Sequence, residues 1–255
     1  MSQWFTNTFP NVVYQGWSGD TGWWTSIIQT LYMTFWSAIF GGILGLIFGL
    51  GLIITAPNGI APNKASFWIF DKVVSLFRAI PFIILLAFIA PFTKLLIGTQ
   101  IGTTAALVPL SLGVFPFYAR QIQVALSEVD SGIVEAAQSV GSSFWDIVFG
   151  VYLREGLSEI IRVSTVTLIS LIGLTAMAGA IGAGGLGNMA ISYGYNRFAT
   201  DTTLVATLLV LILVLTVQVT GDFLAKKFNH NKKRWLIIDQ PSFYLVKVNS
   251  KRSPT

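Results

Sequence analysis

Long apolar stretches, separated by short polar segments, dominate the chain. Five of them come close to or exceed the roughly 20 residues that a helix needs to cross the hydrocarbon core of a bilayer, namely residues 26–54, 67–92, 103–125, 163–181 and 202–224. In the first, Gly41, Gly45 and Gly49 follow at four-residue spacing. Such a ridge of small residues lets another helix pack closely. The pattern predicts an all-α integral membrane protein with five transmembrane helices.

Prolines interrupt two of these predicted spans. The second span contains Pro81, where we expect a kink. Three charged residues are expected in its first turns, near an aqueous surface: Asp71, Lys72 and Arg78. The third span contains Pro109 and Pro116. Prolines inside a span are tolerated where neighbouring helices or a water-filled cavity satisfy the freed carbonyls. This span is therefore expected to line such a cavity or pack on other helices rather than to face lipid.

Residues 130–159 form one long amphipathic stretch between two apolar regions. Its apolar positions follow helical spacing in two sets: Ile133, Ala136, Ala137 and Val140, and then Phe144, Ile147, Val148 and Val151. Asp130 or Ser131 can cap the first helix, Gly141 can turn the chain through a left-handed conformation, and Ser142 or Ser143 can cap the second helix. A helix pair with one apolar face outside the bilayer predicts a docking surface, with packing on its own protein as the alternative.

Composition excludes several classes of protein. With 53% hydrophobic and 11% charged residues, the chain does not match a soluble domain. It has no cysteine, and its one histidine, His230, lies in a polar tail. We therefore expect no metal site, no disulfide and no histidine-activated nucleophile. The net charge of +5 indicates contact with lipid headgroups rather than nucleic acid, because the basic residues gather at the membrane edges.

The distribution of Lys and Arg predicts the orientation. With the N-terminus outside, 14 of the 16 basic residues fall on the inner side, and only Lys94 and Arg197 fall outside. By the positive-inside rule, the C-terminus and the amphipathic stretch are then cytoplasmic in a multi-pass protein of the cell (inner or cytoplasmic) membrane. The chain divides into an extracytoplasmic leader (1–25), a transmembrane domain (26–225) with a cytoplasmic loop at about 127–160, and a basic cytoplasmic tail (226–255).

The two ends of the chain differ in character. The leader carries Trp17, Trp23 and Trp24, which we expect at the membrane interface, where an amphipathic indole is most stable. Residues 229–255 contain apolar patches at 235–238 and 243–248, separated by Pro241. Such a segment can lie on the membrane, contact a partner or be disordered, and the pattern favours the membrane surface.

The amphipathic stretch also resembles a known family. Glu135, Ala136, Ala137 and Gly141, followed by Leu153, resemble the cytoplasmic EAA loop of ABC-importer permeases, except that Arg154 stands where the family usually has proline. The similarity extends from about residue 25 to 227 and is strongest to methionine-uptake permeases. It is carried by residues 77–86, 102–109 and 179–187.

The resemblance implies a type I importer fold and a non-enzymatic permease subunit that works as a homodimer by alternating access. It implies docking of two copies of an ATP-binding subunit, which would carry the ATP and Mg that this chain lacks. It further implies an extracytoplasmic solute-binding protein, a lipoprotein, as a partner. The implied substrate is a small amino acid, methionine. Membrane lipids are expected as further partners and nucleic acid is not.

Three sets of site residues are expected. The resemblance assigns ATPase coupling to Glu135, Ala136, Ala137 and Gly141. A weakly polar stripe predicts a translocation path at Thr167, Ser170, Gly173 and Met177, although hydroxyls in membrane helices often bond only to their own carbonyls. Residues 182–187 match G-x-G-x-x-G, but without a preceding strand they indicate a close-packed turn rather than a dinucleotide site. The resemblance places a receptor-facing loop there, with Asn188, Tyr193, Tyr195 and Asn196 exposed.

Two alternative functions remain open on the sequence. One is a secondary transporter or channel subunit that is not coupled to ATP. The other is a membrane-embedded enzyme or assembly factor. The first is disfavoured because no Asp or Glu is expected in the middle of a span, where ion-coupled carriers commonly place one. The second is disfavoured because the chain is short of nucleophiles and bases.

Overall fold

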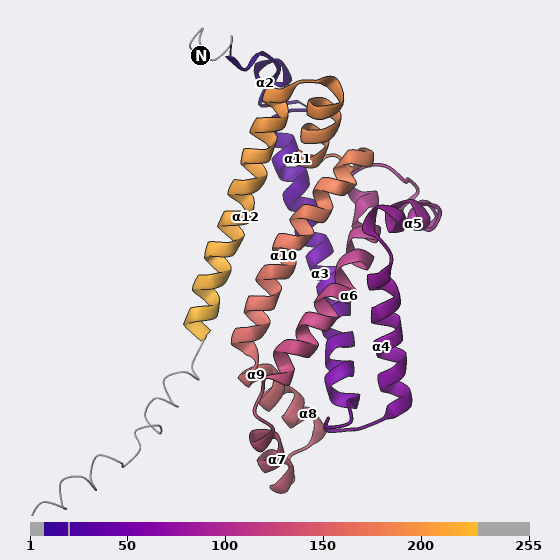
Figure 1. Cartoon of the computed structure of the whole chain (residues 1–255), viewed down its shortest axis with the longest axis vertical. Helices are drawn as coiled ribbons and strands as arrows, with labels where there is room; N and C mark the ends of the chain where they lie inside the picture. Colours follow the sequence, from indigo (N-terminus) through magenta and orange to yellow (C-terminus); the bar gives the residue numbers. More distant parts are fainter. Residues whose placement is uncertain (1–7, 20, 229–255) are drawn as a thin grey trace, which may run out of the picture.

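The computed structural model describes residues 8–19 and 21–228, and every regular element among them is a helix (Figure 1). The long helices are α3 (Trp23–Thr55), α6 (Thr103–Ser127), α10 (Leu157–Ala178) and α12 (Thr200–Phe228). Between α3 and α6 come α4 (Lys64–Ala79) and α5 (Phe82–Ile97). The short elements are α2 (Pro10–Gln15), α7 (Ser131–Ser139), α8 (Phe144–Asp146), η1 (Ile147–Tyr152), α9 (Leu153–Glu155), η2 (Gly179–Ala183), α11 (Gly185–Asn188), η3 (Met189–Gly194) and η4 (Tyr195–Arg197).

Among the described residues, four helices are long and apolar enough to cross a membrane: α3, α6, α12, and α10 continued through η2. The pair α4 and α5 adds a fifth span if the two bent helices are counted as one. The predicted all-α membrane fold is therefore confirmed. The predicted tail, residues 229–255, lies outside the described residues.

Helices α3 and α6 form the central pair of the bundle. Gly41, Gly45 and Gly49 are buried on α3, and each lies against α6. A Cβ atom on Gly45 would be 2.9 Å from the carbonyl oxygen of Phe115, and one on Gly49 would be 2.8 Å from that of Ala119. Only a residue without a Cβ atom permits this approach, so the predicted packing ridge is confirmed.

The predicted second span is divided into two helices. The axes of α4 and α5 differ in direction by 105°. Ile80, between them, is extended (φ −83°, ψ 119°), because the ring of Pro81 excludes its predecessor from the helical region. The expected kink is thus a complete break. Since α4 already begins at Lys64, Arg78 lies in its last turn, and the expected position of Arg78 in the first turns of the span is wrong.

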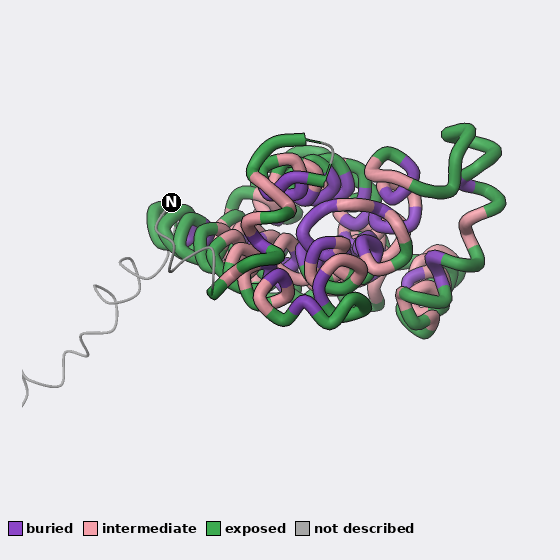
Figure 2. The backbone as a smooth tube through the Cα atoms, turned by 90° about the horizontal axis from the view of Figure 1, so that it is seen from above, coloured by how far each residue is buried: buried purple, intermediate pink, exposed green. Residues whose placement is uncertain are grey.

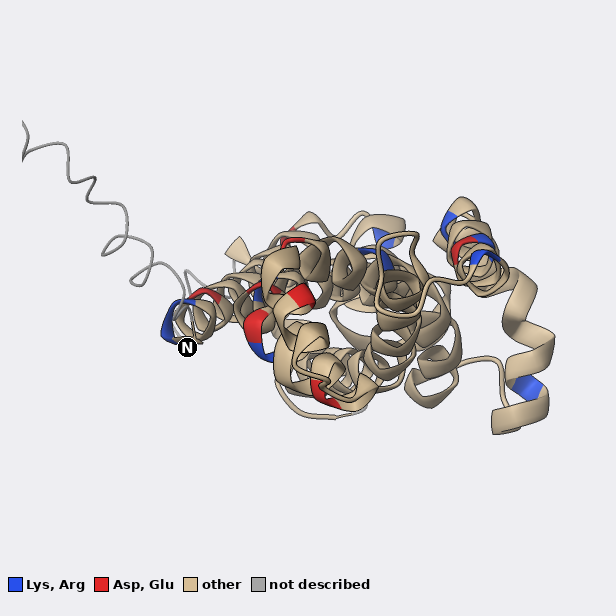
Figure 3. Ribbon diagram, turned by 90° about the horizontal axis from the view of Figure 1, so that it is seen from below, with Lys and Arg blue, Asp and Glu red and all other residues tan. Residues whose placement is uncertain are grey.

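The short elements gather at two opposite ends of the bundle. α7, α8 and α9 lie at one end, and α2 and α11 lie at the other (Figure 1). Buried residues concentrate where α3, α6 and α10 meet, while the outer helices are largely exposed (Figure 2). Several exposed positions of α12 are aliphatic, among them Leu204, Leu211 and Leu215, and suit contact with lipid. Charged residues lie mainly at the α7 end and along α4 (Figure 3).

Candidate functional site

The docking segment, which we define as residues 130–156 from the α7 cap to the end of α9, starts with a capped helix. The Asp130 carboxylate accepts a hydrogen bond from the Gly132 N–H (2.7 Å) at the start of α7. After α7, Gly141 has a φ of +78°, and the Ser142 N–H donates to the Ala137 carbonyl (3.0 Å). Glycine adopts this left-handed conformation at little cost. The predicted Asp130 cap and Gly141 turn are confirmed.

Ser143 caps α8 through a reciprocal pair of hydrogen bonds. The Asp146 N–H donates to the Ser143 hydroxyl (3.3 Å), and the hydroxyl and N–H of Ser143 donate to the Asp146 carboxylate (2.6 Å and 3.2 Å). These bonds, the one from the hydroxyl above all, lower the pKa of the Asp146 carboxyl. The resulting capping box fixes the point at which the second helix begins.

Helix α7 has one face toward the protein and another toward its surroundings. Val134 is buried, whereas Ile133, Ala136 and Val140 are exposed, Val140 at 82%. Ala137 is half-buried. Most of the predicted apolar positions therefore form an outward stripe that no described residue covers. An apolar stripe of this kind on a polar loop marks a surface suited to a partner.

The second amphipathic helix behaves differently. Its Ile147 and Val148 are buried, and Ile147 packs in one apolar cluster with Leu126 of α6. Phe144 (40%), Trp145 (63%) and Phe149 (61%) are exposed, and the rings of the last two stack with centroids 5.7 Å apart. For most of this periodic set the alternative of packing on its own protein holds, because α6 offers Ile147 a close apolar surface; Phe144 alone of the set is exposed.

A cavity of about 600 Å³ lies between α7 and the turn that joins α3 to α4. Its polar lining comprises Asn58, Ser127, Ser131, Glu135 and Gln138. The four candidate coupling residues lie on α7 and in the turn that follows it, and they do not share one face. Glu135 borders the cavity, Ala136 faces outward, Ala137 is half-buried and Gly141 makes the turn.

The four residues expected on a translocation path lie on α10 and differ in burial. Thr167 is buried, Ser170 is half-buried, and Gly173 and Met177 are exposed. The hydroxyls of Thr167 and Ser170 donate to the carbonyls four residues earlier (2.7 Å and 3.0 Å). A Cβ atom on Gly173 would have no neighbour within 4 Å. The alternative of back-bonded hydroxyls therefore holds, and an exposed strip from Ser170 to Met177 remains.

The loop expected to face a receptor lies at the end opposite α7 (Figure 1). Tyr195 (72% exposed) and Asn196 are exposed there. Tyr193 and Asn188 are half-buried, and the guanidinium of Arg197 lies 4.6 Å from the centroid of the Tyr193 ring. Of the four residues, only Tyr195 and Asn196 are fully exposed at the surface.

The glycine-rich turn before this loop is closely packed on α3. The Gly185 N–H donates to the side-chain oxygen of Gln29 (2.7 Å), and the Leu186 N–H donates to the hydroxyl of Thr30 (2.9 Å). Both flanks of the turn are helical. The interpretation as a close-packed turn is confirmed.

Helix α2 of the leader is held on the start of α12. The side-chain amide and backbone N–H of Asn11 both donate to the Asp201 carboxylate (2.9 Å each). Trp23 is fully buried, and its indole N–H donates to the carbonyl of Val12 (3.1 Å). The expected interfacial position of Trp23 is wrong, because its ring is buried against α2. Trp24, in contrast, is exposed.

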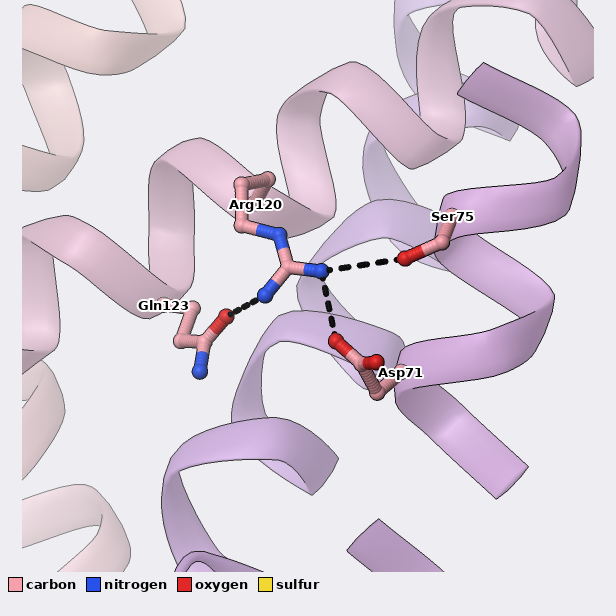
Figure 4. A network of polar contacts seen from close by, with 4 residues as sticks. All are labelled: Asp71, Ser75, Arg120 and Gln123. Carbon is pink, nitrogen blue, oxygen red and sulfur yellow. Dashed lines mark hydrogen bonds and ion pairs between the residues drawn. The ribbon is translucent and has the colours of Figure 1, made fainter. Parts of the chain in front are cut away.

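A polar network between α4 and α6 escaped the sequence analysis. One guanidinium nitrogen of Arg120 lies 2.7 Å from the Asp71 carboxylate and 3.5 Å from the Ser75 hydroxyl, and the other donates to the Gln123 side chain at 2.6 Å (Figure 4). Both charged side chains are 27% exposed. Helical spacing of Asp71 and Ser75 was the available signal, but nothing in the sequence paired them with α6.

A bundle of membrane-spanning helices that holds an amphipathic helix outside its apolar body defines a polytopic membrane subunit. Its family is shown by comparison with known proteins. Residues 41–233 match the model of the binding-protein-dependent transport system inner membrane component, and the chain belongs to that family.

Individual relatives agree with this assignment. The chain is 43% identical over 205 residues to the probable D-methionine transport system permease protein MetI of Pasteurella multocida, covering 80% of this chain and 94% of that one. It is 44% identical over 220 residues to the methionine import system permease protein MetP of Bacillus subtilis, covering 86% and 96%. A chain of the inward-facing MetNI methionine ABC transporter superposes with a TM-score of 0.79 at 37% identity, covering 90% of this chain and all of that one.

Proposed function

We propose that this chain is the permease subunit of an ATP-driven methionine importer and that it functions as a pair. The observation that carries the proposal is the outward stripe of α7, which is exposed in a chain whose relatives are permeases of methionine import systems. In this proposal a separate ATPase, holding ATP and Mg, buries Ile133, Ala136 and Val140. Two ATPase copies serve the permease pair.

The contacts of the docking segment suggest how ATPase movement reaches the membrane. Val134 of α7 and Tyr152 of η1 pack in one apolar cluster with Ile122 and Leu126 of α6. Because a packed cluster does not deform continuously, a displacement of α7 would shift the ends of α6 and α10 together. Rigid-body rocking of this kind can alternate the side on which a path is open.

The same proposal sets the orientation and the outer partner. The α7 end would be cytoplasmic, and the end with α2, Tyr195 and Asn196 would face the extracytoplasmic side, in agreement with the distribution of basic residues. A solute-binding protein would deliver methionine there. Gly141 would keep α7 in position, and the exposed α10 strip would contribute one wall of the path.

Reconstitution tests the proposal. The chain is purified with the ATPase of the proposed importer and placed in liposomes with the receptor, and uptake of labelled methionine is followed with and without ATP. We expect ATP-dependent uptake. Equal uptake in the absence of ATP and of the ATPase would instead support a secondary transporter.

A further inference from the structure

Arg78 lies level with the middle of the membrane-spanning helix α6. The ring of its neighbour Phe77 packs on that of Phe115, with centroids 5.2 Å apart. Phe115 is the central residue of the 25-residue helix α6, roughly 18 Å from either end at the rise of an α-helix. At the centre of a hydrocarbon core about 30 Å thick, an arginine side chain cannot extend to either surface.

The guanidinium of Arg78 has no charged partner within the described part of the chain. Arg78 is exposed, and the two ion pairs found among residues 8–19 and 21–228 involve Arg120 and Arg162 instead. A cation at the bilayer centre costs at least about 2.5 kcal/mol unless it meets water or an opposite charge. The surface around Arg78 therefore faces something other than lipid tails.

A polar stripe connects Arg78 with the α7 end of the bundle. Asp71, Ser75 and Arg78 follow on α4 at the spacing of one helix face. Opposite them, Arg120 and Gln123 of α6 complete the network that joins the two helices (Figure 4). Above Arg78, α4 ends and the chain turns by 105° into α5. The stripe is thus continuous from the lower part of the bundle to the break.

We propose that this stripe lines the aqueous route to the α7 end and that Arg78 binds the carboxylate of the transported amino acid at mid-membrane. The inference rests on the proposed importer function and names a site within it. A guanidinium binds a carboxylate through two parallel hydrogen bonds, which would replace the water that the substrate leaves behind. The neutral Asp71–Arg120 pair below it offers polar contacts without a second net charge to trap the substrate.

Thiol accessibility tests the aqueous route. The chain has no cysteine, so Arg78→Cys introduces a single thiol. Leu76→Cys is the matched control, because Leu76 is 63% exposed on the same helix but points roughly 200° away. The reagent is a charged methanethiosulfonate, applied to the assembled transporter in vesicles. We expect it to modify the thiol at position 78 at least about ten times faster than the thiol at position 76, because the reactive thiolate requires water. Equal rates at the two positions, or no reaction at position 78 in any nucleotide state, would overturn the route.

Uptake by two further variants tests the role of the charge. Loss of a charge-assisted hydrogen bond lowers affinity by about tenfold to hundredfold. We expect methionine uptake to fall by this factor in Arg78→Gln and by less in Arg78→Lys. Both should copurify with the ATPase as the unmodified chain does. Normal uptake by Arg78→Gln would refute carboxylate binding while leaving the importer function intact. Failure of Arg78→Gln to assemble would show that the Arg78 side chain is needed for the structure and would also overturn the proposal.

Discussion

Replacing Gly45 by alanine tests the packing that organises the bundle. The added Cβ atom would lie 2.8 Å from Cδ1 of Tyr118 and 2.9 Å from the carbonyl oxygen of Phe115. The tyrosine ring can rotate, but the carbonyl belongs to the α6 backbone and can move only with that helix. Overpacking of this kind costs about 1–3 kcal/mol. We expect Gly45→Ala to lower the thermal unfolding temperature of the purified chain and to reduce its assembly.

Gly42→Ala is the control for this experiment, because a Cβ atom on Gly42 meets no atom within 4 Å. Replacing glycine by alanine inside a helix stabilises it by about 0.5–1 kcal/mol where the Cβ atom has room, so Gly42→Ala should leave the unfolding temperature unchanged or raise it. Both variants are measured in the same detergent by differential scanning fluorimetry. If Gly45→Ala proves as stable as Gly42→Ala, the close contact between α3 and α6 is refuted.

Three further predictions concern the ends of the bundle. Gly141→Val should reduce ATPase binding and uptake, because a left-handed residue with a Cβ atom costs about 1–2 kcal/mol, whereas Gly141→Asn should retain more of both; normal coupling in the valine variant would contradict the turn. The cap at Asp146 has a lowered carboxyl pKa, so its stabilisation is present above the unfolded value and is lost as the pH falls below about 4. Protection factors of the amides at 144–146, which compare the exchange rate with the intrinsic rate at the same pH, should fall there, and Ser143→Ala should remove that pH dependence. Removal of residues 231–255 should leave assembly intact, and loss of the complex on gel filtration would show that the tail contributes to it.

The apolar pattern predicted the helical bundle well because each span depends on local composition. The glycine ridge could also be predicted, since Gly41, Gly45 and Gly49 specify a close approach whatever the partner helix is. The caps at Asp130 and Ser143 follow from side chains that bond within three residues of their own position. Features of this kind depend on residues that are close together in the sequence, so the sequence pattern alone predicts them.

Features that depend on distant contacts could not be predicted in this way. The break at Pro81 was visible, but its angle depends on how α5 packs against α6. The burial of Ile147 depends on the neighbouring surface of α6, and that of Trp23 depends on α2. The depth of Arg78 followed only when Phe77 was found against Phe115. In each case the sequence specified the side chain and a second segment decided its surroundings.

Capture of a partner through α7 tests the central claim most directly. Ala136→Cys places the chain's one thiol on the outward stripe, and Phe223→Cys places one at an exposed position of α12. After treatment of native vesicles with a short thiol-to-amine crosslinker, mass spectrometry identifies the proteins attached to each. The account predicts that an ATP-hydrolysing subunit is captured through position 136 and not through position 223. Capture of no ATPase through position 136, or equal capture through both, would contradict it.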